Sequence, residues 1–171
     1  MKKRFKIIVS VLIIFVNVSC DQITKQKVRK EIAAHTKINI ISTNFILTKV
    51  ENTGAALSLG ENLSPMLKKI VLQFLPILVL LLLFVHIVKE KKLKKSHLIA
   101  FSCIIGGGLG NIYDRILYNS VTDFMYIEVG IFHTGVFNMA DLSVFVGVII
   151  MLLATVQWPM KKTEQGKTES Y

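Results

Sequence analysis

Four aspartates lie near the ends of apolar segments, where a charged side chain is costly. Asp21 follows the first apolar segment, Asp114 ends the third, Asp141 begins the fourth, and Asp123 lies between the last two. Two carboxylates held close together cannot both ionise easily, so one of them keeps a proton. The ionised carboxylate can then activate a water molecule while its protonated partner polarises a carbonyl group. Two of these four residues could therefore carry out aspartic hydrolysis.

Each polar residue near these ends also has a structural interpretation. Asn138 and Asp141 fit a helix start, with Asn as the N-cap and an acidic side chain in the first turn. Asp114 and Arg115 could form an ion pair that anchors a helix end. Further polar side chains accompany the aspartates, namely Lys25 and Asn111.

Because these polar residues converge, a catalytic role is favoured over a purely structural one. Asp21 and Lys25 have the spacing of a stabilising helical pair, and Asp123 could be a turn residue. Helix capping explains one carboxylate at one terminus, however, and does not explain a carboxylate at every such end. We therefore expect a shared site.

Other catalytic chemistries lack their residues. The sequence has no HExxH motif and no GxSxG motif, and its four histidines are scattered. The glycine-rich stretch at 106–110 lacks the Gly-Lys-Ser/Thr of a phosphate loop and is more typical of close helix packing. The sequence therefore predicts neither a metal nor another cofactor.

Composition indicates an integral membrane protein of one domain. The 171 residues are 52% hydrophobic, with a mean hydropathy of +0.54 and a net charge of +10. Most Lys and Arg residues flank apolar runs, and no nucleic-acid-binding motif is present. Cys20 and Cys103 lie in or beside apolar runs, which suits buried thiols better than a disulfide.

Four apolar segments are long enough for membrane-spanning helices. The predicted spans are residues 6–24, 67–88, 96–117 and 138–158, within one domain over 1–160. Basic residues before the first span, at 89–95 and after the fourth span place both termini in the cytoplasm. The polar tail at 161–171 is expected to be disordered and cytoplasmic.

The first segment has a second interpretation, because its basic start and apolar run lead to Cys20 like a lipoprotein signal peptide. Asn17 stands where such a signal normally has Leu, and cleavage would leave three further spans. We therefore interpret residues 6–24 as an uncleaved span.

The connections expected outside the membrane contain strand-like patterns. Residues 37–52 and 124–132 are rich in Ile, Thr, Val and Phe, partly in alternation with polar residues. The fold expected is thus an all-α membrane protein with four transmembrane helices and a small extracytoplasmic β-cradle.

Five sequence blocks resemble the lipoprotein signal peptidases (signal peptidase II) in order and spacing. They cover nearly the whole chain apart from the tail. The blocks are DQITK at 21–25, ENTGAALS at 51–58, GGGLGNIYDR at 106–115, VTDF at 121–124 and FNMAD at 137–141.

This resemblance implies an aspartic endopeptidase of the bacterial plasma membrane with its active site at the outer face. It implies cleavage of prolipoproteins just before a diacylglyceryl-modified cysteine, contact with membrane lipid, inhibition by globomycin-type peptides and a monomeric state. The catalytic pair falls on Asp123 and Asp141. Supporting positions fall on Asp21, Lys25, Asn52, Gly54, Asn111, Asp114, Arg115 and Asn138.

Asn111 and Asn138 are expected to hold the pair, and Arg115 is expected to pair with Asp114. Leu57 and Gly108 depart from the residues common in that family, as does the LSVF stretch of the fourth span. Two alternatives remain, a small transporter or proton channel and a non-catalytic membrane anchor.

Overall fold

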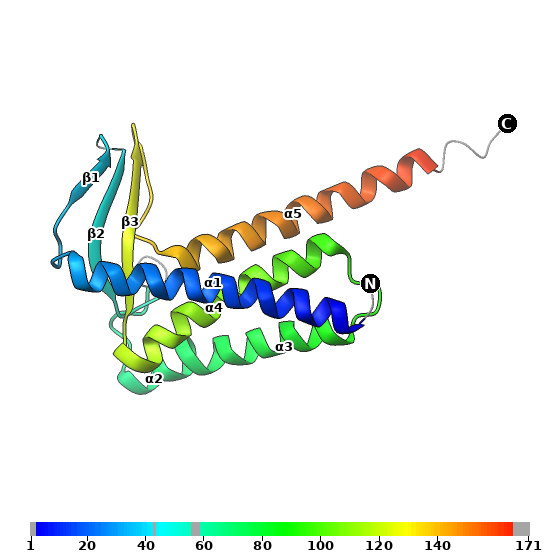
Figure 1. The fold of residues 1–171 in the computed structure, drawn as a ribbon, viewed down its shortest axis with the longest axis horizontal. Coiled ribbons are helices and arrows are strands. Elements are labelled where there is room, and N and C mark those ends of the chain that lie inside the picture. Colours follow the sequence, from blue (N-terminus) through cyan, green and yellow to red (C-terminus); the bar gives the residue numbers. More distant parts are fainter. Residues whose placement is uncertain (1–2, 43, 56–58, 166–171) are drawn as a thin grey trace.

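The computed structural model describes residues 3–42, 44–55 and 59–165, with side chains as far as residue 156. Leu57, one of the departures noted above, lies outside the described residues. The chain forms a helical bundle with a small sheet at one end (Figure 1).

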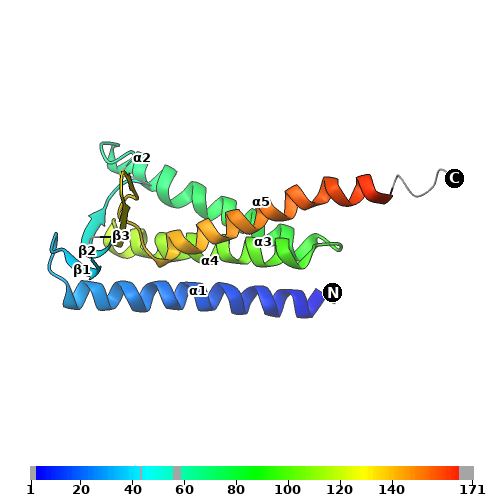
Figure 2. The same ribbon diagram turned by 90° about the horizontal axis from the view of Figure 1, so that it is seen from above.

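Four long helical segments make the bundle. They are α1 (Lys3–Glu31), a continuous segment of α2 (Pro65–Lys69), the π-helix η2 (Ile70–Phe74) and α3 (Leu75–Lys89), then α4 (Lys95–Tyr118) and α5 (Met139–Gln165). α4 packs against α1, α3 and α5, and Figure 2 places α4 and α5 between α1 and α2. The first and last helices run beyond the predicted ends at 24 and 158. Part of the predicted tail is thus helical, and residues 166–171 lie outside the description.

Local sequence explains how the second segment begins and why it contains a π-helix. Ser64 caps α2, its side chain accepting a hydrogen bond from the backbone N–H of Leu67 at 3.4 Å, and Pro65 fits the first turn. Pro76 has no N–H and would crowd the preceding turn of a regular helix. Just before it, the N–H of Leu75 donates to the carbonyl of Ile70, five residues back. The wider π-turn thus accommodates the proline.

Three helical segments are long and apolar enough to cross a membrane within the described residues. They are Lys3–Glu31, Pro65–Lys89 and Met139–Val156. Many of their large apolar side chains face outward, as expected for contact with lipid. α4 is not among the three; it carries Asp114 and Arg115 and packs against α1, α3 and α5. The three segments support part of the predicted four-span arrangement.

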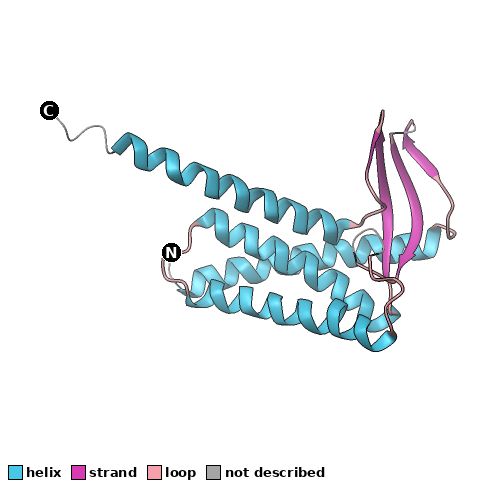
Figure 3. Cartoon of the chain, turned by 180° about the vertical axis from the view of Figure 1, so that it is seen from behind, coloured by secondary structure: helices cyan, strands magenta, loops and turns pink. Residues whose placement is uncertain are grey.

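The sheet has four antiparallel strands in the order β1-β2-β3-β4. These are β1 (Ile38–Ile41), β2 (Phe45–Asn52), β3 (Val121–Val129) and β4 (Phe132–His133). Figure 3 shows the strands together at one end of the bundle. The predicted strand regions are confirmed, but β3 begins at Val121, so Asp123 lies in a strand and not in a turn.

Apolar packing joins the sheet to the bundle. One buried cluster holds α3 to α4 through residues such as Leu80, Ile87 and Ile105. A second cluster contains Val28 and Ile32 beside the end of α1, with Phe124 and Met125 of β3. Since Phe124 follows Asp123, this packing fixes the strand that carries that aspartate.

Candidate functional site

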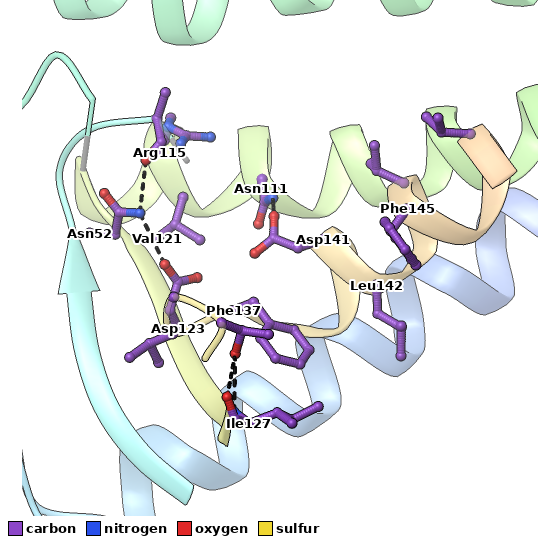
Figure 4. Close-up of a pocket in the computed structure, with 16 residues that line it drawn as sticks. Asn52, Asn111, Arg115, Val121, Asp123, Ile127, Phe137, Asp141, Leu142 and Phe145 are labelled. Atoms are coloured by element: carbon purple, nitrogen blue, oxygen red, sulfur yellow. Dashed lines mark hydrogen bonds between the residues drawn. The ribbon is translucent and has the colours of Figure 1, made fainter. Parts of the chain in front are cut away.

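Asp123 and Asp141 line one cavity of about 770 Å³ where the sheet meets α4 and the start of α5 (Figure 4). Asn52, Asn111 and Arg115 line the same cavity. Its other walls are largely apolar and come from Ala55, Val121, Ile127, Thr134, Gly135, Val136, Phe137, Leu142, Val144, Phe145 and Val148.

Two amide side chains hold Asp123. Its side chain is buried, with 4% exposed. Asn52 donates from Nδ2 to one carboxylate oxygen at 3.0 Å, and Asn138 donates from Nδ2 to the other at 2.6 Å. The antiparallel pairing of Val50 with Asp123 brings the end of β2, and with it Asn52, beside the carboxylate.

Asp141 lies in the first turn of α5 and takes part in its cap. Asn138 Oδ1 accepts a hydrogen bond from the N–H of Asp141 at 2.9 Å, and Asp141 Oδ2 accepts one from the N–H of Asn138 at 3.2 Å. Asn111 Nδ2 donates to the other oxygen of Asp141 at 2.8 Å. The capping interpretation of Asn138 and Asp141 is therefore confirmed, and Asp141 also lines the cavity.

Burial raises the pKa of Asp123 to about 6. The hydrogen bond from Asn52 opposes this rise, and the nearby charge of Asp141 adds to it. Asn138 and Lys25 act in the same direction as Asn52, but the effect of burial is the largest. Asp123 therefore keeps its proton up to about pH 6, where an ordinary aspartate is already ionised.

A buried ion cluster lies beside this cavity. Lys25 Nζ lies 2.8 Å from an oxygen of Asp21 and 3.0 Å from one of Asp114, and all three side chains are fully buried. Arg29 completes the charge balance with an ion pair to Asp114 at 2.9 Å. The predicted helical pair of Asp21 and Lys25 is confirmed.

The ion cluster holds the backbone next to each aspartate of the cavity. Asp21 accepts a hydrogen bond from the N–H of Ala140 at 2.9 Å, one residue before Asp141. Asp114 accepts one from the N–H of Thr122 at 3.4 Å, one residue before Asp123. Burying two carboxylates with their counter-charges thus ties α1 and α4 to both elements that carry the pair.

Arg115 does not pair with Asp114, and that prediction was wrong. Neighbouring residues on a helix point in different directions, so Asp114 faces α1 while Arg115 lines the cavity. Arg115 Nη2 instead donates to the backbone carbonyl of Gly54 at 2.8 Å. Gly54 therefore contributes through its backbone, and its own N–H donates to Asn52 Oδ1 at 2.9 Å.

Asn111 connects the ion cluster to the cavity. Its Oδ1 accepts hydrogen bonds from Lys25 Nζ at 2.9 Å and from Asn138 Nδ2 at 3.1 Å. Because its Nδ2 donates to Asp141, its orientation is fixed from both sides. The expectation that Asn111 and Asn138 hold the aspartate pair agrees with these contacts.

Sequence reasoning missed Arg29 and Gln22. Arg29 donates from Nε to Thr122 Oγ1 at 2.8 Å, and Gln22 donates to both Asp21 and Asp114. Arg29 follows Lys25 by four residues, as Lys25 follows Asp21, so one helix face carries all three charges. That spacing was a signal that could have found Arg29.

No group of three His, Cys, Asp or Glu residues able to hold a metal ion occurs in the described part of the chain. Cys20 is exposed on α1, which continues without interruption as far as Glu31. The segment that resembled a signal peptide is therefore part of one continuous helix. The same helix carries Asp21 and Lys25 of the ion cluster.

Comparison with known proteins places this geometry in a family. Residues 13–157 match the family described as signal peptidase (SPase) II. Lipoprotein signal peptidases from Clostridium novyi and Clostridium acetobutylicum are 33% and 34% identical, covering 84% and 89% of this chain and 94% and 96% of their own lengths. A solved bacterial membrane enzyme shares the fold with a TM-score of 0.79 and 28% identity, over 95% of this chain and 93% of that one.

The matches cover both the bundle and the sheet, and thus every residue of the cavity described above. The chain belongs to the signal peptidase II family.

Proposed function

We propose that Asp123 and Asp141 are the catalytic pair of an aspartic endopeptidase that removes signal peptides from prolipoproteins. The observation that carries this proposal is that two carboxylates from different elements line one cavity and share Asn138 as a hydrogen-bonding partner. Membership of the signal peptidase II family supports the reaction and replaces the transporter and anchor alternatives.

The environments of the two carboxylates give them different roles. Asp123, whose pKa is raised by burial, holds the proton and donates it toward the scissile carbonyl oxygen. Asp141 accepts hydrogen bonds from Asn111 and from the backbone N–H of Asn138 at the start of α5, and these hold its carboxylate in the cavity. It takes a proton from a water molecule as that water attacks the carbonyl carbon.

The resulting tetrahedral intermediate collapses when the C–N bond breaks and the leaving nitrogen receives a proton from the pair. Water adds directly, so no acyl-enzyme forms. Asn52 and Asn138 keep the Asp123 carboxyl in place during these transfers. No step in this scheme requires a metal or another cofactor.

The apolar part of the cavity suits a signal peptide in the bilayer. Leu142, Phe145 and Val148 continue the cavity along α5, away from the polar end. An apolar signal helix placed there would bring its carboxyl end to Asp123 and Asp141. We propose that the cut falls just before the diacylglyceryl-modified cysteine, with the lipid toward the bilayer.

We propose that the bundle crosses the bacterial plasma membrane four times, with both termini in the cytoplasm. The start of α1, the α3–α4 connection and the last turns of α5 lie at the end opposite the sheet (Figure 1). Basic residues concentrate in that connection, where KEKKLKK spans 89–95. The sheet and the aspartate pair then lie at the outer face, where a monomer would meet its substrates and globomycin-type inhibitors.

A cleavage assay with charge-neutralising variants tests the catalytic assignment. The purified full chain is given a diacylglyceryl-modified prolipoprotein, and product is followed by its mobility shift. Asp123→Asn and Asp141→Asn should each lower the rate by about 10²–10⁴-fold, because each removes one proton-transfer group. Glu128→Gln removes an exposed carboxylate from the same strand as Asp123 and should cut normally. Near-normal cleavage by either aspartate variant would overturn the pair.

A further inference from the structure

A second cavity of about 280 Å³ lies between the start of the second helical segment and the end of α4. We call it the basic cavity. Its lining residues are Thr53, Leu63, Pro65, Lys68, Lys69, Leu72, Gln73, Arg115 and Asn119.

The charge of the basic cavity is one-sided. Lys68, Lys69 and Arg115 line it, and its lining includes no Asp or Glu. Lys68 Nζ donates to Thr53 Oγ1 at 3.2 Å, so this ammonium group is held in place by a neutral partner. None of the ion pairs among the described residues involves either lysine. Lys68 and Lys69 thus bring positive charge that no ion pair among the described residues neutralises, whereas the charge of Arg115 is opposed by Asp123, Asp141 and Asp114.

The carboxyl end of α4 borders the basic cavity through Arg115 and Asn119, and a helix C-terminus carries partial negative charge. The backbone carbonyl of Arg115 accepts hydrogen bonds from Gln73 Nε2 at 3.1 Å and from the N–H of Asn119 at 3.1 Å. Gln73 lies in the π-helix η2, and such turns are frequent at functional sites. The negative pole of α4 is therefore partly satisfied from within the protein.

Arg115 retains a donor. Its Nη2 is bonded to the carbonyl of Gly54, but its buried Nε has no hydrogen-bond partner among the described residues. A buried donor without an acceptor is costly, and an anion is a strong acceptor for guanidinium. Arg115 lines both cavities, so an anion bound in the basic cavity would lie next to the proposed catalytic site.

We propose that the basic cavity binds a phosphate group at the outer membrane surface. Two lysines and an arginine supply charge and donors of the kind that phosphate requires. Under the proposed orientation, Lys68 and Lys69 lie at the outer end of a membrane span, which is the depth of lipid headgroups. The phosphate can come from an anionic glycerophospholipid or from free phosphate.

Binding measurements on the purified full chain in detergent test this site without relying on peptidase activity. The probes are short-chain phosphatidylglycerol, short-chain phosphatidylcholine and inorganic phosphate. Lys68→Gln/Lys69→Gln should weaken phosphatidylglycerol binding by about 30-fold, equivalent to about 2 kcal/mol for two lysines. Wild type should prefer phosphatidylglycerol to phosphatidylcholine, a comparison that needs no variant.

Lys27→Gln/Lys30→Gln is the matched control, since it removes the same charge from exposed positions near the outer end of α1. It should leave binding within about 3-fold of wild type, because its effect is only that of general surface charge. The proposed phosphate site would be contradicted if both double variants weakened phosphatidylglycerol binding equally. It would also be contradicted if the wild-type protein bound phosphatidylglycerol no better than phosphatidylcholine.

The probes also separate the two sources of phosphate. If inorganic phosphate binds as tightly as the lipid and the basic-cavity variant weakens both, the phosphate group alone is the ligand. If only phosphatidylglycerol binds and the same variant weakens it, the ligand is a lipid. Either result confirms a phosphate site, whatever the outcome of the cleavage assay.

Discussion

Asp123 carries the clearest electrostatic signature in the sheet, because its pKa is the one that burial raises to about 6. Its carboxyl is buried, and its pKa rises to about 6 although two amides donate to it. In the proposed mechanism Asp123 donates a proton toward the scissile carbonyl, so it must be protonated when the reaction begins. The active form is therefore lost as Asp123 deprotonates, that is, as the pH rises through about 6.

The pH profile of cleavage should show the loss of activity as Asp123 deprotonates, and Asn52 should set the pH at which this loss occurs. We expect kcat/KM to fall as the pH rises above about 6. Asn52→Leu removes a donor that stabilises ionised Asp123, so it should raise the pKa and move the falling limb to higher pH. The measurement is kcat/KM from pH 4 to 9 for both proteins.

Thr134→Val provides the comparison, because Thr134 lines the same cavity and bonds to Ile127 instead of Asp123. Its falling limb should stay where the wild-type limb lies. A limb that Asn52→Leu leaves in place, or moves to lower pH, would contradict the assignment of the proton to Asp123.

Close contact between α4 and α5 positions the start of α5, which carries Asp141. α4 presents a run of glycines to its neighbours, and two of them meet very different surfaces. A Cβ at Gly107 would clash with the backbone carbonyl of Ala140 in α5, one residue before Asp141. A Cβ at Gly108 would meet the side chain of Leu80 at 2.7 Å, and a leucine can change rotamer. Of these two glycines, only Gly107 is therefore required by contact with the backbone of a neighbouring helix.

Alanine substitutions at these two positions should differ in effect. Gly107→Ala must push α5 away from α4, costing about 1–3 kcal/mol of stability and disturbing the position of Asp141. Gly108→Ala should cost less, about 1 kcal/mol or below, because only Leu80 must move. The measurements are thermal unfolding in detergent and cleavage rate.

The two glycines are adjacent and undergo the same change in helix propensity, so each variant is the control for the other. Similar losses of stability and activity in both would show that contact with the backbone of α5 does not set the position of Asp141.

Whether α4 crosses the membrane decides on which side of it the sheet and the aspartate pair lie. α4 carries Asp114 and Arg115 near the end at which it meets the sheet, and the connection at 90–94 lies at its other end. If α4 crosses the membrane, the sheet and that connection must lie on opposite sides.

Thiol labelling tests this topology. In a chain with Cys20→Ser and Cys103→Ser, Ile131→Cys should react with a membrane-impermeant thiol reagent added outside intact cells. Lys92→Cys should react only after the membrane is opened. Both positions are exposed in the protein, so burial does not limit either reaction. Labelling of both from the same side would contradict the crossing by α4.

The sequence by itself determined the elements and the neighbourhood of the site. Apolar runs required helices, alternating β-branched residues required strands, and the cost of charge near lipid made the polar residues converge. Those patterns depend only on the chain and its solvent, so they could be read without a structure. Helix ends were less accurate, since α1 continues to Glu31.

Only the tertiary structure decided which partner each polar residue takes. Four aspartates converge, yet Asp21 and Asp114 are fully buried in the ion cluster while Asp123 and Asp141 line the cavity. Adjacent helical residues point about 100° apart, so Arg115 could not share the partners of Asp114. Because the spacing along one chain does not fix which helix faces which, the pairing of charges depended on how α1, α4 and α5 pack.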